Sequence, residues 1–109
     1  FKDTCHIDWN QPVKKIYDFV RGLSPYPAAW TELISADGKR MVLKVYQTKK
    51  RPATHNFPVG SIHTDHKSYI DVVKDGFLRL HSLQLAGKKR MNITDFLNGF
   101  KQIAEYTVG

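Results

Sequence analysis

A helical spacing of apolar residues is clearest near the start of the chain, in NQPVKKIYDFVRGL at residues 10–23. The apolar side chains that share one side of this helix are Val13, Ile16, Tyr17 and Val20. Asn10 can cap the helix, Pro12 suits its first turn, and Gly22 stands where a left-handed C-terminal cap is usual. The pattern predicts a helix over about residues 11–21. In LSPYPAAW, which follows, two prolines exclude regular helix and predict a rigid connector.

Downstream of the connector, short runs of β-branched, aromatic and aliphatic residues alternate with turn sequences. These runs predict five strands, at residues 29–34, 41–48, 60–64, 69–74 and 77–85. The Asp-Gly pairs in ADG (36–38) and KDG (74–76) tolerate the positive φ that a tight hairpin turn requires. Each of them therefore predicts a hairpin.

The last of these runs changes phase within itself. Leu78 and Leu80 occupy even positions, whereas Leu83 and Leu85 occupy odd ones. A slip of one residue, here near positions 81 and 82, is what a β-bulge produces, and bulges bend strands where a sheet closes into a barrel. The sequence therefore predicts a mainly β fold, a small five-stranded OB-like barrel.

A second, short helix is predicted after the last strand, in NITDFLNGF. Asn92 can cap it, Asp95 stands at its third position, and Gly99 is expected to stop it. The tail at residues 101–109 has weak periodicity and predicts no element. We expect one domain without internal repeats, in which residues 1–28 form the N-terminal helix and Pro-rich connector and residues 29–109 form the OB-like barrel.

The charge balance narrows the class of partner. Lysine and arginine outnumber aspartate and glutamate by 17 to 10, a net charge of +7. Such an excess in 109 residues favours an anionic partner, with nucleic acid first. An acidic membrane surface fits less well, because no helical stretch sets a cationic face against a wide apolar one.

Cysteine content and the chain's first residues bear on its cellular context. The single cysteine, Cys5, excludes an intrachain disulfide, and the sequence has neither a signal-like segment nor a membrane-spanning one. We therefore expect a cytoplasmic protein. Because the sequence starts without Met in what reads as ordinary sequence, we also expect it to be a piece of a longer protein.

The titratable residues form no familiar catalytic or metal-binding motif. His63 and His66, in HTDH, lie three residues apart and so on opposite faces of a strand, and zinc sites commonly draw on thiolates. Cys5 and His6 are adjacent and have no third group to orient them as a nucleophile and its base. The glycines are scattered at turns and caps and form no phosphate-binding loop. No metal, bound cofactor or catalytic residue is therefore expected in this chain.

Basic residues gather in three short stretches, GKR (38–40), KKR (49–51) and GKKR (87–90). Loop cations often serve only solubility, but two such stretches on one face of a small barrel would neutralise several phosphates. The candidate phosphate-binding residues are Lys88, Lys89 and Arg90, then Lys49, Lys50 and Arg51, and third Arg21, which can equally serve the helix dipole.

The aromatic residues available for stacking are Trp9, Tyr26, Trp30, Tyr46 and Phe57. Because Trp9 precedes the helix and Trp30 follows the connector, we expect both to hold these segments against the barrel. Cationic loops combined with buried rings favour recognition of the backbone and shape of a folded RNA over base reading.

Two motifs resemble those of one protein family. IDWNQPVKKIYDFVRGLSPYPAAWTEL is similar to the junction region of methionyl-tRNA formyltransferases, and LQLAGKKRMNITDFLNG is similar to a stretch near the end of their C-terminal domain. Tyr26 stands where this family often has Trp, a change that keeps an aromatic residue in place. The middle of the chain, at residues 38–74, is similar only loosely.

The resemblance implies an OB-like C-terminal domain that follows a formyltransferase domain absent from this sequence. In that case the parent enzyme would use 10-formyltetrahydrofolate as its co-substrate and formylate initiator methionyl-tRNA, and this chain would help to hold the tRNA without catalysing the reaction. Other folate-dependent formyltransferases share the barrel, so a structural or interaction module without tRNA binding is the alternative. The unbroken GKKRM, at residues 87–91, and the positive charge favour the tRNA enzyme.

Overall fold

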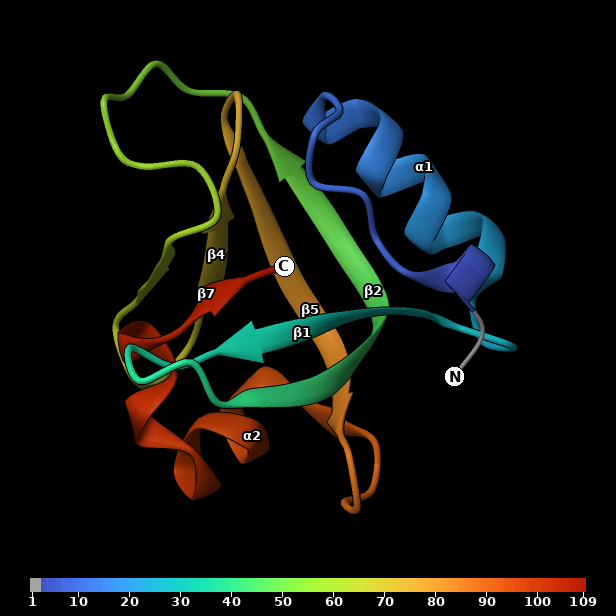
Figure 1. The fold of residues 1–109 in the computed structure, drawn as a ribbon, viewed down its shortest axis with the longest axis vertical. Helices are drawn as coiled ribbons and strands as arrows, with labels where there is room; N and C mark the ends of the chain where they lie inside the picture. Colours follow the sequence, from blue (N-terminus) through green and yellow to red (C-terminus); the bar gives the residue numbers. More distant parts are fainter. Residues whose placement is uncertain (1–2) are drawn as a thin grey trace.

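Seven strands form one antiparallel sheet in the structure, a computed structural model that describes residues 3–109 (Figure 1). Residues 1 and 2, the first of the predicted N-terminal segment, lie outside the described part. The elements in chain order are η1 (Asp3–Cys5), α1 (Val13–Leu23), β1 (Ala29–Ile34), β2 (Arg40–Arg51), β3 (Ile62–Thr64), β4 (Ile70–Val73), β5 (Phe77–Leu85), β6 (Met91–Asn92), α2 (Ile93–Gly99), η2 (Lys101–Glu105) and β7 (Thr107–Val108).

The sheet curls until its two ends meet. Its strand order is β3-β4-β5-β2-β1-β7, with β6 paired to β5. Ser61, directly before β3, forms an antiparallel bridge with Thr107 of β7, and the Val108 N–H donates to the Gly60 carbonyl at 3.1 Å. The predicted mainly β barrel is therefore confirmed, with α1 alongside β2 and α2 at the other end of the molecule (Figure 1).

All five predicted strands are present, but their bounds match to different degrees. β3 and β4 are shorter than the strands predicted at residues 60–64 and 69–74. The first and last predicted strands match β1 and β5 at both ends. The predicted count of five is too low, because β6 and β7 contain two residues each and are too short to show a period. β2 is also longer than predicted and extends to Arg51, since its last residues are polar but still pair with β5.

The predicted bulge is confirmed, and both paired strands take part in it. Val45 pairs with Leu83 and Thr48 with Leu80, while Gln47 pairs with Ser82. One residue on each strand is therefore extra, Tyr46 on β2 and His81 on β5. Before the bulge the odd-numbered residues of β2 face the core side of the sheet, and after the bulge the even-numbered residues do.

Helix α1 begins and ends differently from the prediction. Its first residue, Val13, donates its backbone N–H to the Asp75 carboxylate at 2.8 Å, so the cap comes from the β4–β5 turn and the proposed cap by Asn10 is wrong. The helix also continues through Gly22 to Leu23, because the Leu23 side chain extends the apolar stripe that packs on the core. The prediction that Gly22 forms the C-terminal cap is therefore wrong as well.

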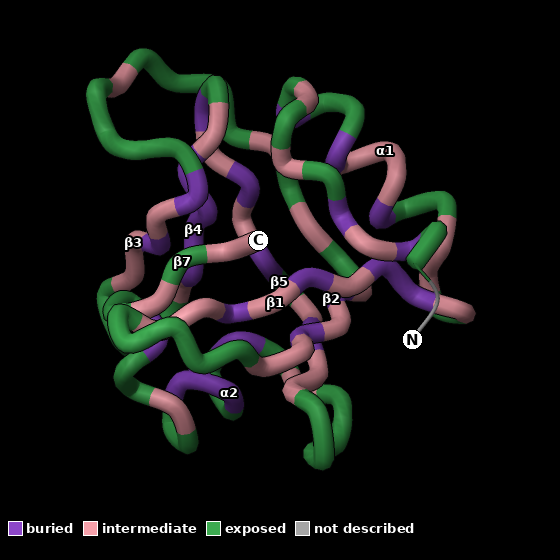
Figure 2. Tube along the Cα trace, viewed as in Figure 1, coloured by how far each residue is buried: buried purple, intermediate pink, exposed green. Residues whose placement is uncertain are grey.

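The other local expectations agree with the contacts. Asn92 caps α2, its side-chain oxygen accepting the Asp95 N–H at 2.9 Å, and α2 ends at Gly99. The Trp9 indole N–H donates to the Thr31 hydroxyl at 2.9 Å, which holds the segment before α1 against β1. The buried residues follow the strands and one side of each helix, whereas the segment between β2 and β3 is largely exposed (Figure 2).

Candidate nucleic-acid interface

A polar groove of about 430 Å³ lies between α1 and the bulged part of β2. Its lining comes from the second half of α1, the residue after that helix, the middle of β2 and the loop before β6: Tyr17, Val20, Arg21, Ser24, Tyr46, Gln47, Thr48 and Arg90. Hydroxyl, amide and guanidinium groups therefore face one hollow. We call it the tyrosine groove.

Cations lie over the two tyrosine rings of the groove. Arg21 and Lys50 both lie over Tyr17, the guanidinium carbon 5.4 Å and the ammonium nitrogen 4.7 Å from the ring centre. Arg90 lies over Tyr46, with its guanidinium carbon 4.3 Å from the ring centre. The electron-rich ring faces favour a fixed cation position. Arg21 also donates from Nη2 to the Asp18 carboxylate at 3.4 Å, and its remaining N–H groups are available to an anion.

Hydrogen bonds fix the loop that carries Arg90. The Tyr46 hydroxyl donates to the Gln84 side-chain oxygen at 2.6 Å, and the Gln84 amide donates to the Lys88 carbonyl at 2.7 Å. Arg90 itself donates from Nε to the Ser82 hydroxyl at 2.7 Å. Bonds within the chain therefore hold the loop between β5 and β6 in place, which reduces the ordering cost of binding a ligand there.

The structure divides both predicted triplets of cations between different surfaces. Strand alternation places Lys50 on the α1 side, whereas Lys49 and Arg51 lie on the other face of β2. Lys88 and Lys89 line a separate hollow of about 170 Å³ whose other walls are mostly apolar. One cation from each predicted group is thus found at the tyrosine groove: Arg21 and Arg90 line it, and Lys50 lies over its Tyr17 ring.

Sequence reasoning missed one further cation, Arg79 of β5. It lies on the same face as Arg51, and both bind the carboxylate of Asp71, whose side chain is only 5% exposed. The hydrogen bond to Asp71 raises the pKa of the Arg79 guanidinium. The alternation of β5 could have placed Arg79 on the face away from the core. Its pairing with Asp71 of β4 could not be predicted, because no local pattern links the two residues.

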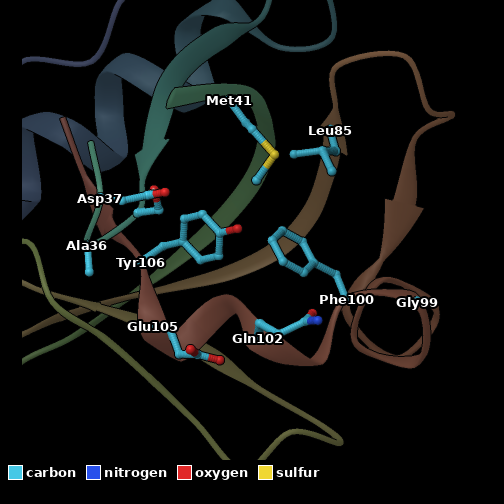
Figure 3. Close-up of a pocket in the computed structure, with 10 residues that line it drawn as sticks. Ala36, Asp37, Met41, Leu85, Gly99, Phe100, Gln102, Glu105 and Tyr106 are labelled. Atoms are coloured by element: carbon cyan, nitrogen blue, oxygen red, sulfur yellow. The ribbon is translucent and has the colours of Figure 1, made fainter. Parts of the chain in front are cut away.

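A further hollow, near the end of the barrel that α2 covers, is a poor site for an anion. It measures about 520 Å³ and lies between the β1–β2 hairpin and the α2–η2 segment. Met41, Leu85, Phe100 and Tyr106 turn toward one another, and the carboxylates of Asp37 and Glu105 lie at the edge (Figure 3). Its charge is opposite to that of the tyrosine groove.

Among residues 3–109, no group of three His, Cys, Asp or Glu side chains is placed to hold a metal ion. None of the helices in this part of the chain is long and apolar enough to cross a membrane. Neither finding adds a site to the tyrosine groove.

Comparison with known proteins identifies relatives for nearly the whole chain. Residues 1–101 match the family described as formyl transferase, C-terminal domain. A methionyl-tRNA formyltransferase of Parabacteroides distasonis is 91% identical over all of this chain, and one of Phocaeicola vulgatus is 64% identical over 93% of it. A third, of Bacteroides thetaiotaomicron, is 56% identical over 93% of the chain. The chain spans about a third of the length of these curated relatives, 34% of the first.

Proposed function

The chain belongs to the formyl transferase C-terminal domain family, and from that premise we propose that it is the tRNA-binding part of a methionyl-tRNA formyltransferase. The parent enzyme would transfer the formyl group of 10-formyltetrahydrofolate to the α-amino group of initiator methionyl-tRNA, a reaction of translation initiation in the cytoplasm. The names of the relatives support this reaction.

The observation that carries the proposal is that Arg21 and Arg90 line the tyrosine groove together, while Lys50 lies over the Tyr17 ring of the same groove. Three cations held at fixed positions suit the phosphates of a folded nucleic acid, for which position matters as much as charge. The hydroxyl and amide groups of Thr48 and Gln47 add neutral donors and acceptors for phosphate or ribose oxygens. A negatively charged backbone therefore fits this groove better than any other hollow described above.

Within this proposal the chain positions the tRNA and does not catalyse formyl transfer. The family comparison covers a C-terminal domain, so the folate and the reacting amine would be bound by the remaining two thirds of the parent protein. That neighbouring formyltransferase domain is the second partner that we propose. Binding by two domains joined in one chain raises the effective concentration of the weaker one.

The test removes the three groove cations from the full-length enzyme as Arg21→Gln, Lys50→Gln and Arg90→Gln together. We expect the slope of log affinity for tRNA against log salt concentration to become shallower by about 2 to 3, at about 0.7 to 0.9 per phosphate contact. KM for tRNA should rise while binding of the folate stays unchanged.

The matched control removes the same charge from the other end of the molecule, as Lys88→Gln, Lys89→Gln and Lys101→Gln, three exposed lysines that belong to neither proposed RNA contact. If the groove binds the tRNA, this variant retains most of the original slope. Equal losses in the two variants would show that charge acts diffusely, and unchanged tRNA binding in both would favour a purely structural module.

A further inference from the structure

A second surface lies on the face of β2, β5, β4 and β3 that points away from the core. Register places Lys49 opposite Arg79, Arg79 opposite Asp71, and Asp71 opposite His63. Directly opposite residues of paired strands share a face, so these four form one row across the sheet. Phe77 pairs with Arg51 in the next row of the same face. We call this surface the outer face.

Four rings meet at one end of the outer face, where the segment between β2 and β3 folds over the sheet. They are His55, Phe57, His63 and Phe77, which we call the ring cluster. The Phe57 ring lies 4.4 Å from that of His63, edge to face, and His55 lies 5.1 Å from Phe77. Phe57 is nevertheless 49% exposed, although an apolar ring would ordinarily be buried.

The exposed position of Phe57 is fixed by contacts beneath it. His55 bonds through Nε2 to the Lys74 carbonyl at 2.7 Å and accepts the Phe57 N–H at Nδ1, 3.2 Å away. Gly76 permits the close approach, because a Cβ there would lie 2.7 Å from the Arg51 carbonyl oxygen. The segment is thus held against the β4–β5 turn, and the ring is ordered before any partner arrives.

Cations accompany the ring cluster on the outer face. Lys49 is exposed, and the side chains of Arg51 and Arg79 are 47% and 26% exposed. Asp71 is buried beneath the two guanidinium groups and offsets one of their charges. The face therefore combines an ordered aromatic ring with a net positive charge, the combination that binds single-stranded nucleic acid.

We propose that the ring cluster stacks an unpaired base of the bound RNA on Phe57, while Lys49 and Arg51 contact the adjoining phosphates. The charge complementarity decides the occupant, because an apolar protein surface would have to cover Lys49 without a counter-ion, together with Arg51 and Arg79, which share the single Asp71 carboxylate. The proposal rests on the proposed function in one respect, since the base belongs to the RNA held in the tyrosine groove. The ring cluster would add a contact with a base to the contacts that the tyrosine groove makes with the RNA backbone.

The experiment compares Phe57→Leu with the unchanged full-length protein, using a short unstructured RNA strand and a blunt RNA duplex as probes. Leucine keeps an apolar side chain on a half-exposed position and removes the flat ring. We expect binding of the strand to weaken about 5-fold or more, because stacking on an aromatic residue contributes roughly 1 to 3 kcal/mol per base. Duplex binding and the salt slope should not change, since no charge is removed.

Two further variants keep the outcome decisive. Phe57→Trp retains a ring and should bind the strand at least as tightly as the unchanged protein, which separates stacking from a loss of folding. The triple groove variant should lower the salt slope for strand and duplex alike. If the triple groove variant leaves the salt slope unchanged while Phe57→Leu weakens strand binding, the groove does not bind RNA and the ring cluster acts independently of it.

One result overturns the inference whatever the groove variant does: strand binding by Phe57→Leu that equals that of the unchanged protein. A lower melting temperature of Phe57→Leu in the full-length protein, with RNA binding unchanged, would show that the ring serves only to pack against His55 and His63, and it would overturn the inference in the same way.

Discussion

Replacing Asp71 by Asn tests the buried charge on which the outer face is built. The Asp71 carboxylate accepts bonds from Arg51 Nη1 at 2.9 Å and from Arg79 Nε and Nη2 at 2.8 and 3.1 Å. Asn keeps one acceptor oxygen, turns the other into a donor that faces guanidinium groups, and removes the charge. The substitution therefore leaves two cations without their counter-ion in contact with a buried side chain.

The expected loss of stability follows from burial. Breaking a buried ion pair costs about 3 to 5 kcal/mol. Here the side chains of Arg51 and Arg79 are partly exposed, at 47% and 26%, and can turn toward water. We therefore expect Asp71→Asn to lower the free energy of unfolding by about 2 to 3 kcal/mol. For a chain of this size that corresponds to a decrease in Tm of roughly 10 °C.

Urea unfolding of the 109-residue chain at pH 7, followed by tryptophan fluorescence, measures this difference. Double-mutant cycles refine it, because Arg79 makes two bonds to Asp71 and is the less exposed partner, so its coupling energy should exceed that of Arg51. A loss below about 0.5 kcal/mol would refute the reasoning, since desolvation of the carboxylate would then cancel its bonds. A larger coupling to Arg51 would show that the geometry is misassigned.

Two other carboxylates give sharper local predictions. Asp75→Ala removes the bond to the Val13 N–H and should destabilise the chain by about 1 kcal/mol in urea, whereas Asp75→Asn, which keeps the acceptor, should retain most of the stability; equal losses would exclude capping. The pKa of Asp65 is lowered far below its usual range, first by the Ser68 hydroxyl and then by the Ser68 N–H. Its contribution is therefore complete above the unfolded-state pKa of about 3.9 and is lost as the pH falls through the folded-state pKa. The difference in unfolding free energy between the unchanged chain and Asp65→Asn should shrink as the pH falls below about 4, and a difference that stays constant to lower pH would contradict this assignment.

How far the sequence predicts the fold depends on whether the signal is local. Alternation along the strands and the Asp-Gly turns are local, and β1 and β5 were located at both ends. The cap of α1 is not local, since Asp75 lies 62 residues from Val13. The bulge was visible because hydrophobic residues change phase in β5, but its counterpart at Tyr46 carries no such change.

The sequence predicted which cations are candidates for the site, but it did not predict which of them lie together in space. A run such as Lys49–Lys50–Arg51 looks like one cluster, yet a strand must send its middle residue to the opposite face. The groove forms because the barrel closes and places α1 beside β2 and the loop that carries Arg90. That proximity comes from tertiary packing, and no spacing in the sequence encodes it.

The turn between β4 and β5 sets the distance between the two proposed RNA contacts, the tyrosine groove and Phe57. Asp75 of this turn holds the first residue of α1, and its neighbours Lys74 and Gly76 hold the segment that carries the ring cluster. One short turn thus fixes the distance between the tyrosine groove and Phe57. An inserted residue here would change that distance, whereas an insertion in the exposed β1–β2 turn at residues 36–39 would leave it intact.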